Sequence, residues 1–134
     1  MDINELVDNF ELLEDWEDKY SYLISLGELL PPMADILKTD DTRVKGCTSQ
    51  VWLVLGRDDE GKINFLADSD AKIVRGLVAV LFVIFNGQSA AAAKNINVED
   101  IFKKIGLEQH LSPNRRNGFF SMLGRINSFI EANS

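Results

Sequence analysis

The sequence predicts an α+β domain in which a small antiparallel sheet is covered by helices. Two short segments rich in β-branched and aromatic residues, 50–55 and 62–67, flank the turn sequence at 58–61. On both sides of this hairpin, apolar residues recur at three- and four-residue steps, which is the helical period. A length of 134 residues suits one core, so we expect a single domain over residues 1–134.

The amino-terminal part is predicted to form two amphipathic helices followed by a loop. Their apolar stripes share helical spacing: Leu6, Phe10 and Leu13 in the first, and Trp16, Tyr20, Leu23, Leu26 and Leu30 in the second. The pair Pro31-Pro32 limits the second helix at about Leu30, because proline lacks an amide donor and pushes the preceding residue out of the α region. The loop is expected to run through Arg43.

A long helix is predicted after the hairpin, over residues 71–86. We expect Asp70 to be its N-cap and Gly87 to end it in the left-handed conformation. Its apolar run at 77–85 is far shorter than the roughly 20 residues that a bilayer span needs. The run therefore indicates a buried helix, and we expect no membrane partner.

Three further helices complete the predicted fold. Two short ones are expected at 89–94 and 97–104, with Gly106 ending the second. The last begins with Ser112 as N-cap and Pro113 in its first turn, where proline is favoured. Its core stripe follows helical steps: Phe119, Met122, Leu123, Ile126, Phe129 and Ile130.

The charge of the chain disfavours a nucleic-acid partner. The net charge is -7 and the pI is near 4.6, whereas proteins that track phosphates are basic. The acidic excess lies in residues 1–43, with 12 acidic and 3 basic residues, while the remaining 91 residues carry 9 acidic and 11 basic ones. We interpret most of these carboxylates as solvated helix faces.

Cysteine and histidine each occur once, as Cys47 and His110. One thiol excludes an intramolecular disulfide and every multi-thiolate zinc or iron–sulfur site, so we expect no metal and no cofactor. The amino terminus MDINELVDNF lacks the basic and apolar regions of a signal peptide. Together with the unpaired cysteine, this predicts a reducing, cytoplasmic location.

Cys47 lies on the loop that leads into the first predicted strand. A lone cysteine is more often a small buried hydrophobic residue than a reactive group. Three neighbouring features favour reactivity: Gly46 permits close backbone approach, the segment 48–50 (Thr-Ser-Gln) supplies hydroxyl and amide groups, and Lys45 is a cation that favours a thiolate. None of these features is specific alone, so both interpretations remain open on the residues.

Several distinct motifs follow one another along nearly the whole chain. They lie at 9–10, 15–20, 26–27, 30–31, 44–53 (VKGCTSQVWL), 68–77 (DSDAKIVRGL) and 111–118 (LSPNRRNG). In order and spacing they resemble the SufE family of cysteine desulfuration proteins, which accept sulfur in iron–sulfur cluster assembly. The departures are small: Thr48 stands where the family often has glutamine, Arg116 where it often has serine, and 90–93 where it is more polar.

The resemblance implies a persulfide carrier and activator rather than an enzyme, with the compact α+β fold that the family shares with cluster scaffold proteins. Cys47 would take sulfur from the persulfide of a pyridoxal-phosphate cysteine desulfurase, either SufS-like or a companion paralogue, and pass it to an iron–sulfur scaffold complex. Arg115, Lys45 and Asp70 are assigned to partner binding or to stabilising the persulfide. We expect a monomer or a weak homodimer, with the Cys47 side chain shielded until the partner docks.

Two rival functions use the same residues. The first is a hydrolase with Cys47 as nucleophile and His110 as base, which lacks a third, orienting motif. The second is a cluster scaffold on the same fold, which fails because one cysteine and one histidine do not make the usual four-thiolate set.

Overall fold

The two predicted strands pair as an antiparallel hairpin in the computed structural model, which describes residues 1–133. Strands β1 (Val51–Arg57) and β2 (Ile63–Ser69) form the only sheet of the described residues, with Val51 opposite Ser69. The turn forms because the Asp58 side chain accepts hydrogen bonds from two backbone amides and Gly61 takes a φ of +79°. The α+β prediction is confirmed.

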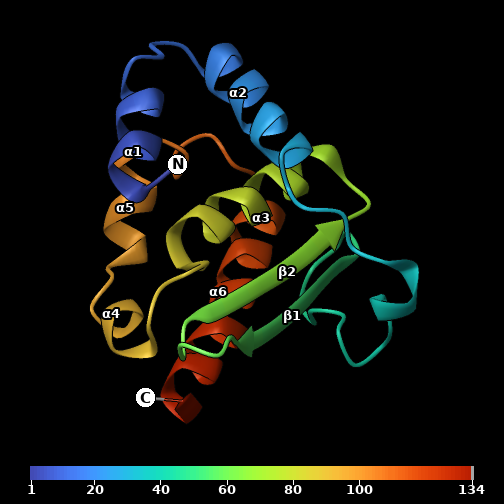
Figure 1. Ribbon diagram of the computed structural model, residues 1–134. Coiled ribbons are helices and arrows are strands. Elements are labelled where there is room, and N and C mark those ends of the chain that lie inside the picture. The colour runs from blue at the N-terminus through green and yellow to red at the C-terminus, as the bar shows by residue number, and fades with distance from the viewer. Residues whose placement is uncertain (134) are drawn as a thin grey trace.

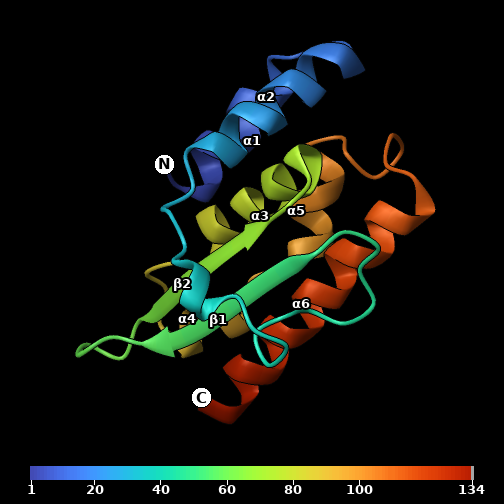
Figure 2. The ribbon, with the colours of Figure 1, turned by 90° about the vertical axis from the view of Figure 1, so that its right-hand side faces the viewer.

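Helices cover this hairpin in the predicted order. They are α1 (Ile3–Glu11), α2 (Trp16–Glu28), α3 (Lys72–Phe85), α4 (Ala90–Lys94), α5 (Val98–Lys104) and α6 (Pro113–Asn133), with the 3₁₀ turn η1 (Asp35–Leu37) before β1. Figures 1 and 2 show α3 between α2 on one side and the hairpin and α6 on the other. Helix α3 is apolar almost all round, as a helix enclosed on several sides requires, and its predicted apolar run is buried except for Phe82 and Val83, which are partly buried.

The core joins all layers of the molecule. Its largest fully buried side chains come from α1, α3, α5 and α6 together: Phe10, Phe85, Phe102 and Phe119. The rings of Phe102 and Phe119 stack with centroids 4.5 Å apart, which fixes α5 against α6. None of the helices among residues 1–133 combines the length and the apolar character that crossing a membrane requires.

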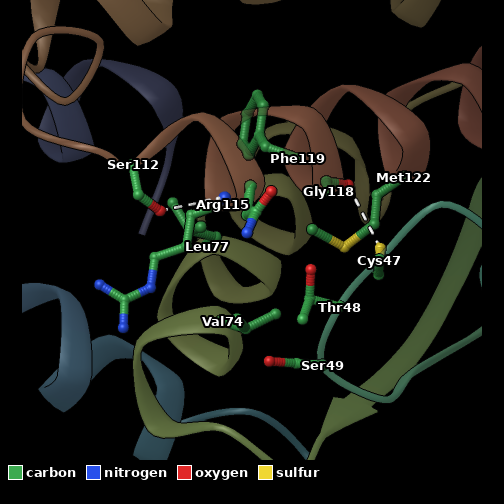
Figure 3. A pocket seen from close by; sticks show the side chains of 11 residues that line it. Cys47, Thr48, Ser49, Val74, Leu77, Ser112, Arg115, Gly118, Phe119 and Met122 are labelled. Atoms are coloured by element: carbon green, nitrogen blue, oxygen red, sulfur yellow. Dashed lines mark hydrogen bonds between the residues drawn. The ribbon is translucent and has the colours of Figure 1, made fainter.

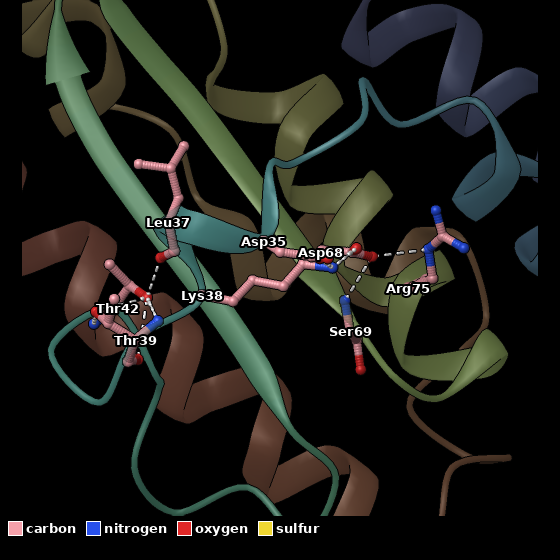
Figure 4. Close-up of polar contacts among 8 residues, drawn as sticks. All are labelled: Asp35, Leu37, Lys38, Thr39, Thr42, Asp68, Ser69 and Arg75. Carbon is pink, nitrogen blue, oxygen red and sulfur yellow. Dashed lines mark hydrogen bonds and ion pairs between the residues drawn. The ribbon is translucent and has the colours of Figure 1, made fainter.

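The segment between α2 and β1 departs from a plain loop because it contains η1. Lys38 fastens this turn to the sheet through an ion pair with Asp68, with Nζ and Oδ2 3.0 Å apart, and its ammonium lies 5.2 Å from the Trp52 ring centroid. Asp68 also pairs with Arg75 of α3 at 3.0 Å (Figure 4). The hydrogen bond to Asp68 raises the pKa of Lys38. One carboxylate thus ties η1, β2 and α3 together.

The predicted N-cap of α3 is wrong. The helix begins at Lys72, so the cap position falls on Ala71, which makes no side-chain cap bond. Asp70 lies one residue further out, where its carboxylate accepts a hydrogen bond from the Gln50 amide at 3.1 Å. Strand pairing extends to Ser69, so the helix starts only after it. Asp70 instead holds Gln50, at the end of the segment that carries Cys47.

The other predicted helix boundaries are close to those observed. Ser112 accepts a hydrogen bond from the Arg115 amide at 3.3 Å, as an N-cap does. Gly87 has a φ of +82° and ends α3 in the left-handed conformation. Helix α2 ends at Glu28, two residues before the predicted limit, because Leu29 and Leu30 close its last turn by bonding back to α2 carbonyls.

Candidate functional site

Cys47 lies at the tip of a loop that rests against α6. We call residues 45–50 the cysteine loop. The Cys47 side chain is half-buried, and its Sγ donates a hydrogen bond to the carbonyl oxygen of Gly118 at 3.6 Å. This bond joins the tip of the loop to the second turn of α6 (Figure 3). The thiol of the free protein is therefore partly covered rather than fully presented to solvent.

Both ends of the cysteine loop are fixed to the sheet. The Val44 amide donates to the Val51 carbonyl at 2.8 Å and closes the loop. At the other end, the Gln50 amide donates to Asp70, and the Gln50 carbonyl accepts from the Ser69 hydroxyl at 2.8 Å. The sulfur-to-carbonyl bond at the tip is long and weak in comparison. The tip is thus the part of the loop that is easiest to release.

Gly46 allows the close backbone approach that the sequence predicts. Its φ is +85°, in the left-handed region that favours glycine. A Cβ added here would lie 2.7 Å from the Ser121 hydroxyl of α6. The loop therefore approaches the helix more closely than a larger residue allows, and this approach brings Cys47 to Gly118.

A cavity of about 400 Å³ opens beside the sulfur. Its lining comes from the cysteine loop, α3 and the start of α6: Cys47, Thr48, Ser49, Val74, Leu77, Ser112, Asn114, Arg115, Gly118, Phe119 and Met122. Figure 3 shows Cys47, Thr48 and Ser49 on one side of this cavity and Arg115 on the other. The cavity next to the thiol is thus lined by polar side chains of the cysteine loop and of α6 and by apolar side chains of α3 and α6.

Burial raises the pKa of the Cys47 thiol, and the positive charge of Arg43 lowers it by a smaller amount. Arg43 is a cation that the sequence did not single out beside this thiol. Lys45 is exposed and does not line the cavity. The net effect is a raised pKa, which disfavours the thiolate form of Cys47 in the free protein.

Alkylation should report this protection. We expect iodoacetamide to modify Cys47 more slowly in the folded protein than in the protein unfolded in urea, because only the thiolate reacts and burial disfavours it. Since the pKa is raised, the rate in the folded protein should reach half its maximum above pH 9.0, the ordinary value for a cysteine. The measurement is intact mass against time across a pH series, and equal rates in the two states would contradict the covered geometry.

Arg115 lies at the cavity but not at the sulfur. Its backbone amide is used by the Ser112 cap, and its side chain is exposed. Figure 3 shows the guanidinium directed away from Cys47. This geometry suits contact with a partner at the rim of the cavity better than contact with a sulfur atom on Cys47.

His110 is not brought to Cys47. Its ring stacks on Trp16, with centroids 4.7 Å apart and planes 15° from parallel. It lines a different cavity, together with Lys19 and Gly106, and is absent from the lining beside the thiol. Within residues 1–133, no three His, Cys, Asp or Glu side chains are grouped so as to hold a metal ion.

Two residues of the site carried no role in the sequence analysis, Gly118 and Arg43. Gly118 lies inside α6, where a Cβ would come 3.4 Å from the Cys47 sulfur. A glycine in a helix interior costs about 1 kcal/mol relative to alanine and so signals a close approach. For Arg43 the sequence holds no comparable signal, because its effect depends on how the loop folds back.

The fold and the site define a small α+β domain that carries one loop thiol beside a cavity. The solution structure of a hypothetical protein from Thermus thermophilus is similar to it, with a TM-score of 0.78 at 19% identity, over 98% of this chain and 94% of that one. This similarity concerns the fold alone.

Sequence comparison adds the family. The model of the SufE family, described as an Fe-S metabolism associated domain, matches residues 4–130. An uncharacterised SufE-like protein of Rhizobium meliloti is 46% identical over 96% of this chain and 94% of its own length. A second, from Rhizobium etli, is 43% identical over 92% and 86%. The chain belongs to the SufE family, which is associated with iron–sulfur metabolism.

Proposed function

We propose that the protein accepts a sulfur atom from the persulfide of a cysteine desulfurase onto Cys47 and passes it on for iron–sulfur cluster assembly. The observation that carries this proposal is the single thiol of the chain, held at a loop tip beside a cavity in a member of the SufE family. In this role the protein is a carrier and an activator, because removing the sulfur frees the desulfurase for another turnover.

The transfer is an exchange at sulfur. The Cys47 thiolate attacks the terminal sulfur of the desulfurase persulfide, a new S–S bond forms on Cys47, and the old S–S bond breaks. The desulfurase thiolate leaves and takes up a proton, which balances the one that Cys47 gave up. No oxidant is consumed. As in thiol–disulfide exchange, the rate depends on thiolate fraction, leaving group and access.

Docking must therefore change the surroundings of the thiol. In the free protein the sulfur is half-buried and bonded to Gly118, and burial raises the pKa of the thiol. We infer that the partner draws the tip of the cysteine loop out, which breaks this one weak bond and ends the burial that raises the pKa. Protection in the free state limits oxidation of a thiol that is reactive only when docked.

Partners and location follow from this role. The donor would be a desulfurase that holds the pyridoxal phosphate itself, so the carrier needs no cofactor. The recipient would be an iron–sulfur scaffold complex in the cytoplasm. We propose a monomer or a weak homodimer, since one cysteine loop is enough for one transfer.

Intact mass tests the proposal. The protein is mixed with candidate desulfurases, free cysteine and pyridoxal phosphate, and then separated under non-reducing conditions. We expect the wild-type chain to gain the mass of one sulfur atom and to lose it on treatment with a reductant. Absence of any gain with every desulfurase tested would overturn the proposed function.

Replacing Arg115 with alanine should weaken stimulation of the desulfurase while leaving the fold intact. The side chain is exposed and at the rim of the cavity, so its loss removes a partner contact and little packing. We expect a higher concentration of the variant to be needed for half-maximal stimulation. Arg57→Ala is a matched control at an exposed strand end. Unchanged stimulation by Arg115→Ala would remove this residue from the interface.

The hydrolase alternative is disfavoured by the position of His110, which stacks on Trp16 and lines another cavity. We expect His110→Ala to accept sulfur at the wild-type rate, because persulfide exchange needs no histidine base. The measurement is the initial rate of mass gain at a saturating desulfurase concentration. Loss of sulfur acceptance in a folded His110→Ala variant would instead support a base.

A further inference from the structure

Arg125 holds the segment that precedes the cysteine loop. Its guanidinium donates two hydrogen bonds from α6, one from Nη1 to the Arg43 carbonyl at 2.9 Å and one from Nη2 to the Asp41 carbonyl at 3.2 Å. A guanidinium is planar and presents its donors in a fixed fork, so two carbonyls of one segment can be held in one geometry. Neither acceptor is a carboxylate, so the contact fixes backbone position.

The Arg125 contact is one of three contacts between α6 and residues 43–47. Gly118 accepts the Cys47 thiol, Ser121 faces Gly46, and Arg125 holds the backbone of Arg43. These three helix positions are spaced by three and four residues and therefore lie on one face. Figure 2 shows the segment before β1 lying along α6.

The three contacts differ in strength. The bond at Gly118 is a single sulfur donor at 3.6 Å, whereas Arg125 makes two charge-assisted bonds of ordinary length. The Val44 amide bonds to Val51 immediately after the Arg125 contact. Release of the tip would therefore leave the base of the loop in place, and Cys47 would swing from a fixed point.

We propose that Arg125 is a positioning residue for Cys47, which anchors the base of the cysteine loop to α6 so that the released thiol reaches the donor sulfur along one path. The part of this inference that concerns sulfur transfer rests on the proposed function. The part that concerns the resting loop does not. Arg125 is not among the residues that line the cavity, and its two hydrogen bonds go to backbone carbonyls, so it acts through the backbone.

The test compares Arg125→Gln, Arg125→Lys and the control Arg57→Gln, which makes the same chemical change at an exposed strand end. A urea titration first shows that each variant is folded under the conditions of the assays. Two quantities are then measured: the rate of Cys47 alkylation in the free protein, and desulfurase stimulation as a function of variant concentration.

We expect Arg125→Gln to alkylate faster than wild type, and its maximal stimulation to fall by about tenfold or more, since small misplacements of a reacting group carry large rate penalties. The concentration for half-maximal stimulation should not change. Arg125→Lys keeps the charge but loses the fork, and we expect it to restore only part of the maximal rate. Arg57→Gln should match wild type in both assays.

Three results would overturn the inference. One is wild-type behaviour of Arg125→Gln in both assays. Another is a rise in the half-maximal concentration alone, which would make Arg125 a partner contact. The third is full rescue by Arg125→Lys, which would reduce its role to charge. If the wild-type chain accepts no sulfur, the proposed function fails, and unchanged alkylation of Arg125→Gln still overturns the anchoring role separately.

Discussion

Replacing Cys47 with serine is expected to abolish sulfur acceptance completely. After incubation with desulfurase, cysteine and pyridoxal phosphate, the variant should keep its starting mass, whereas wild type gains one sulfur atom. The chain has no other thiol, and a serine hydroxyl cannot form a persulfide. Stimulation of the desulfurase should fall to the level seen without the protein, because no acceptor removes its sulfur.

Loss of structure should not explain this result. Serine is close to cysteine in size, and its hydroxyl can donate to Gly118 as the thiol does. We expect the free energy of unfolding of Cys47→Ser to lie within about 1 kcal/mol of wild type, as for most mild substitutions. Circular dichroism and a urea titration check this before the sulfur assay is interpreted.

A second variant separates the site from the mere presence of a thiol. Ser128 is exposed on α6, away from the cavity lining, so Cys47→Ser combined with Ser128→Cys presents one accessible cysteine elsewhere. We expect this double variant to gain no sulfur from the desulfurase. Acceptance at the wild-type rate by either variant would show that position 47 has no special part in the transfer.

The fold could be predicted because its signals are local. The hairpin turn, the Ser112 cap and the stop at Gly87 each depend on residues within a few positions of one another. The error at Asp70 has the opposite origin. Its carboxylate is used by Gln50, twenty positions away in the chain, and no local pattern contains that partner.

The site shows the same division between local and distant information. Cys47 and its glycine neighbour could be singled out from the sequence, but the α6 residues that contact the cysteine segment are remote. Gly118 is 71 residues from Cys47, and Arg125 is 82 residues from Arg43. The sequence singled out Lys45 as the neighbouring cation, and the structure adds Arg43, four residues before Cys47, whose charge lowers the pKa of the thiol.

The close crossing of α2 and α3 leads to the largest stability effect that we expect. Gly76 of α3 faces α2, where an added Cβ would overlap the Leu23 carbonyl oxygen and lie 2.7 Å from Leu23 Cγ. Gly27 approaches from the other side, and a Cβ there would lie 2.8 Å from the Gly76 nitrogen. Backbone meets backbone at this point, so the two helices must separate to admit even one methyl group.

We therefore expect Gly76→Ala to lower the free energy of unfolding by about 3 kcal/mol or more, at the upper end for overpacked sites. This is a large part of the roughly 5–15 kcal/mol of a typical domain. Gly124→Ala is the matched control, because Gly124 also lies inside a helix, but an added Cβ there would meet nothing within 4 Å beyond its chain neighbours and its own helix backbone. Alanine at position 124 should raise the free energy of unfolding by about 0.5–1 kcal/mol, because alanine has a higher helix propensity than glycine.

The urea midpoints of the two variants should thus move in opposite directions, with an unchanged dependence on denaturant. The shift in Gly76→Ala should also reach the thiol, since Val74 and Leu77 of α3 line the cavity beside Cys47. Alkylation of Cys47 should be faster in Gly76→Ala than in Gly124→Ala at the same low urea concentration. If the urea midpoint of Gly76→Ala rises as much as that of Gly124→Ala, then α2 and α3 do not cross at backbone contact. In that case the position of Val74 and Leu77 beside Cys47 does not depend on the packing of α3 against α2.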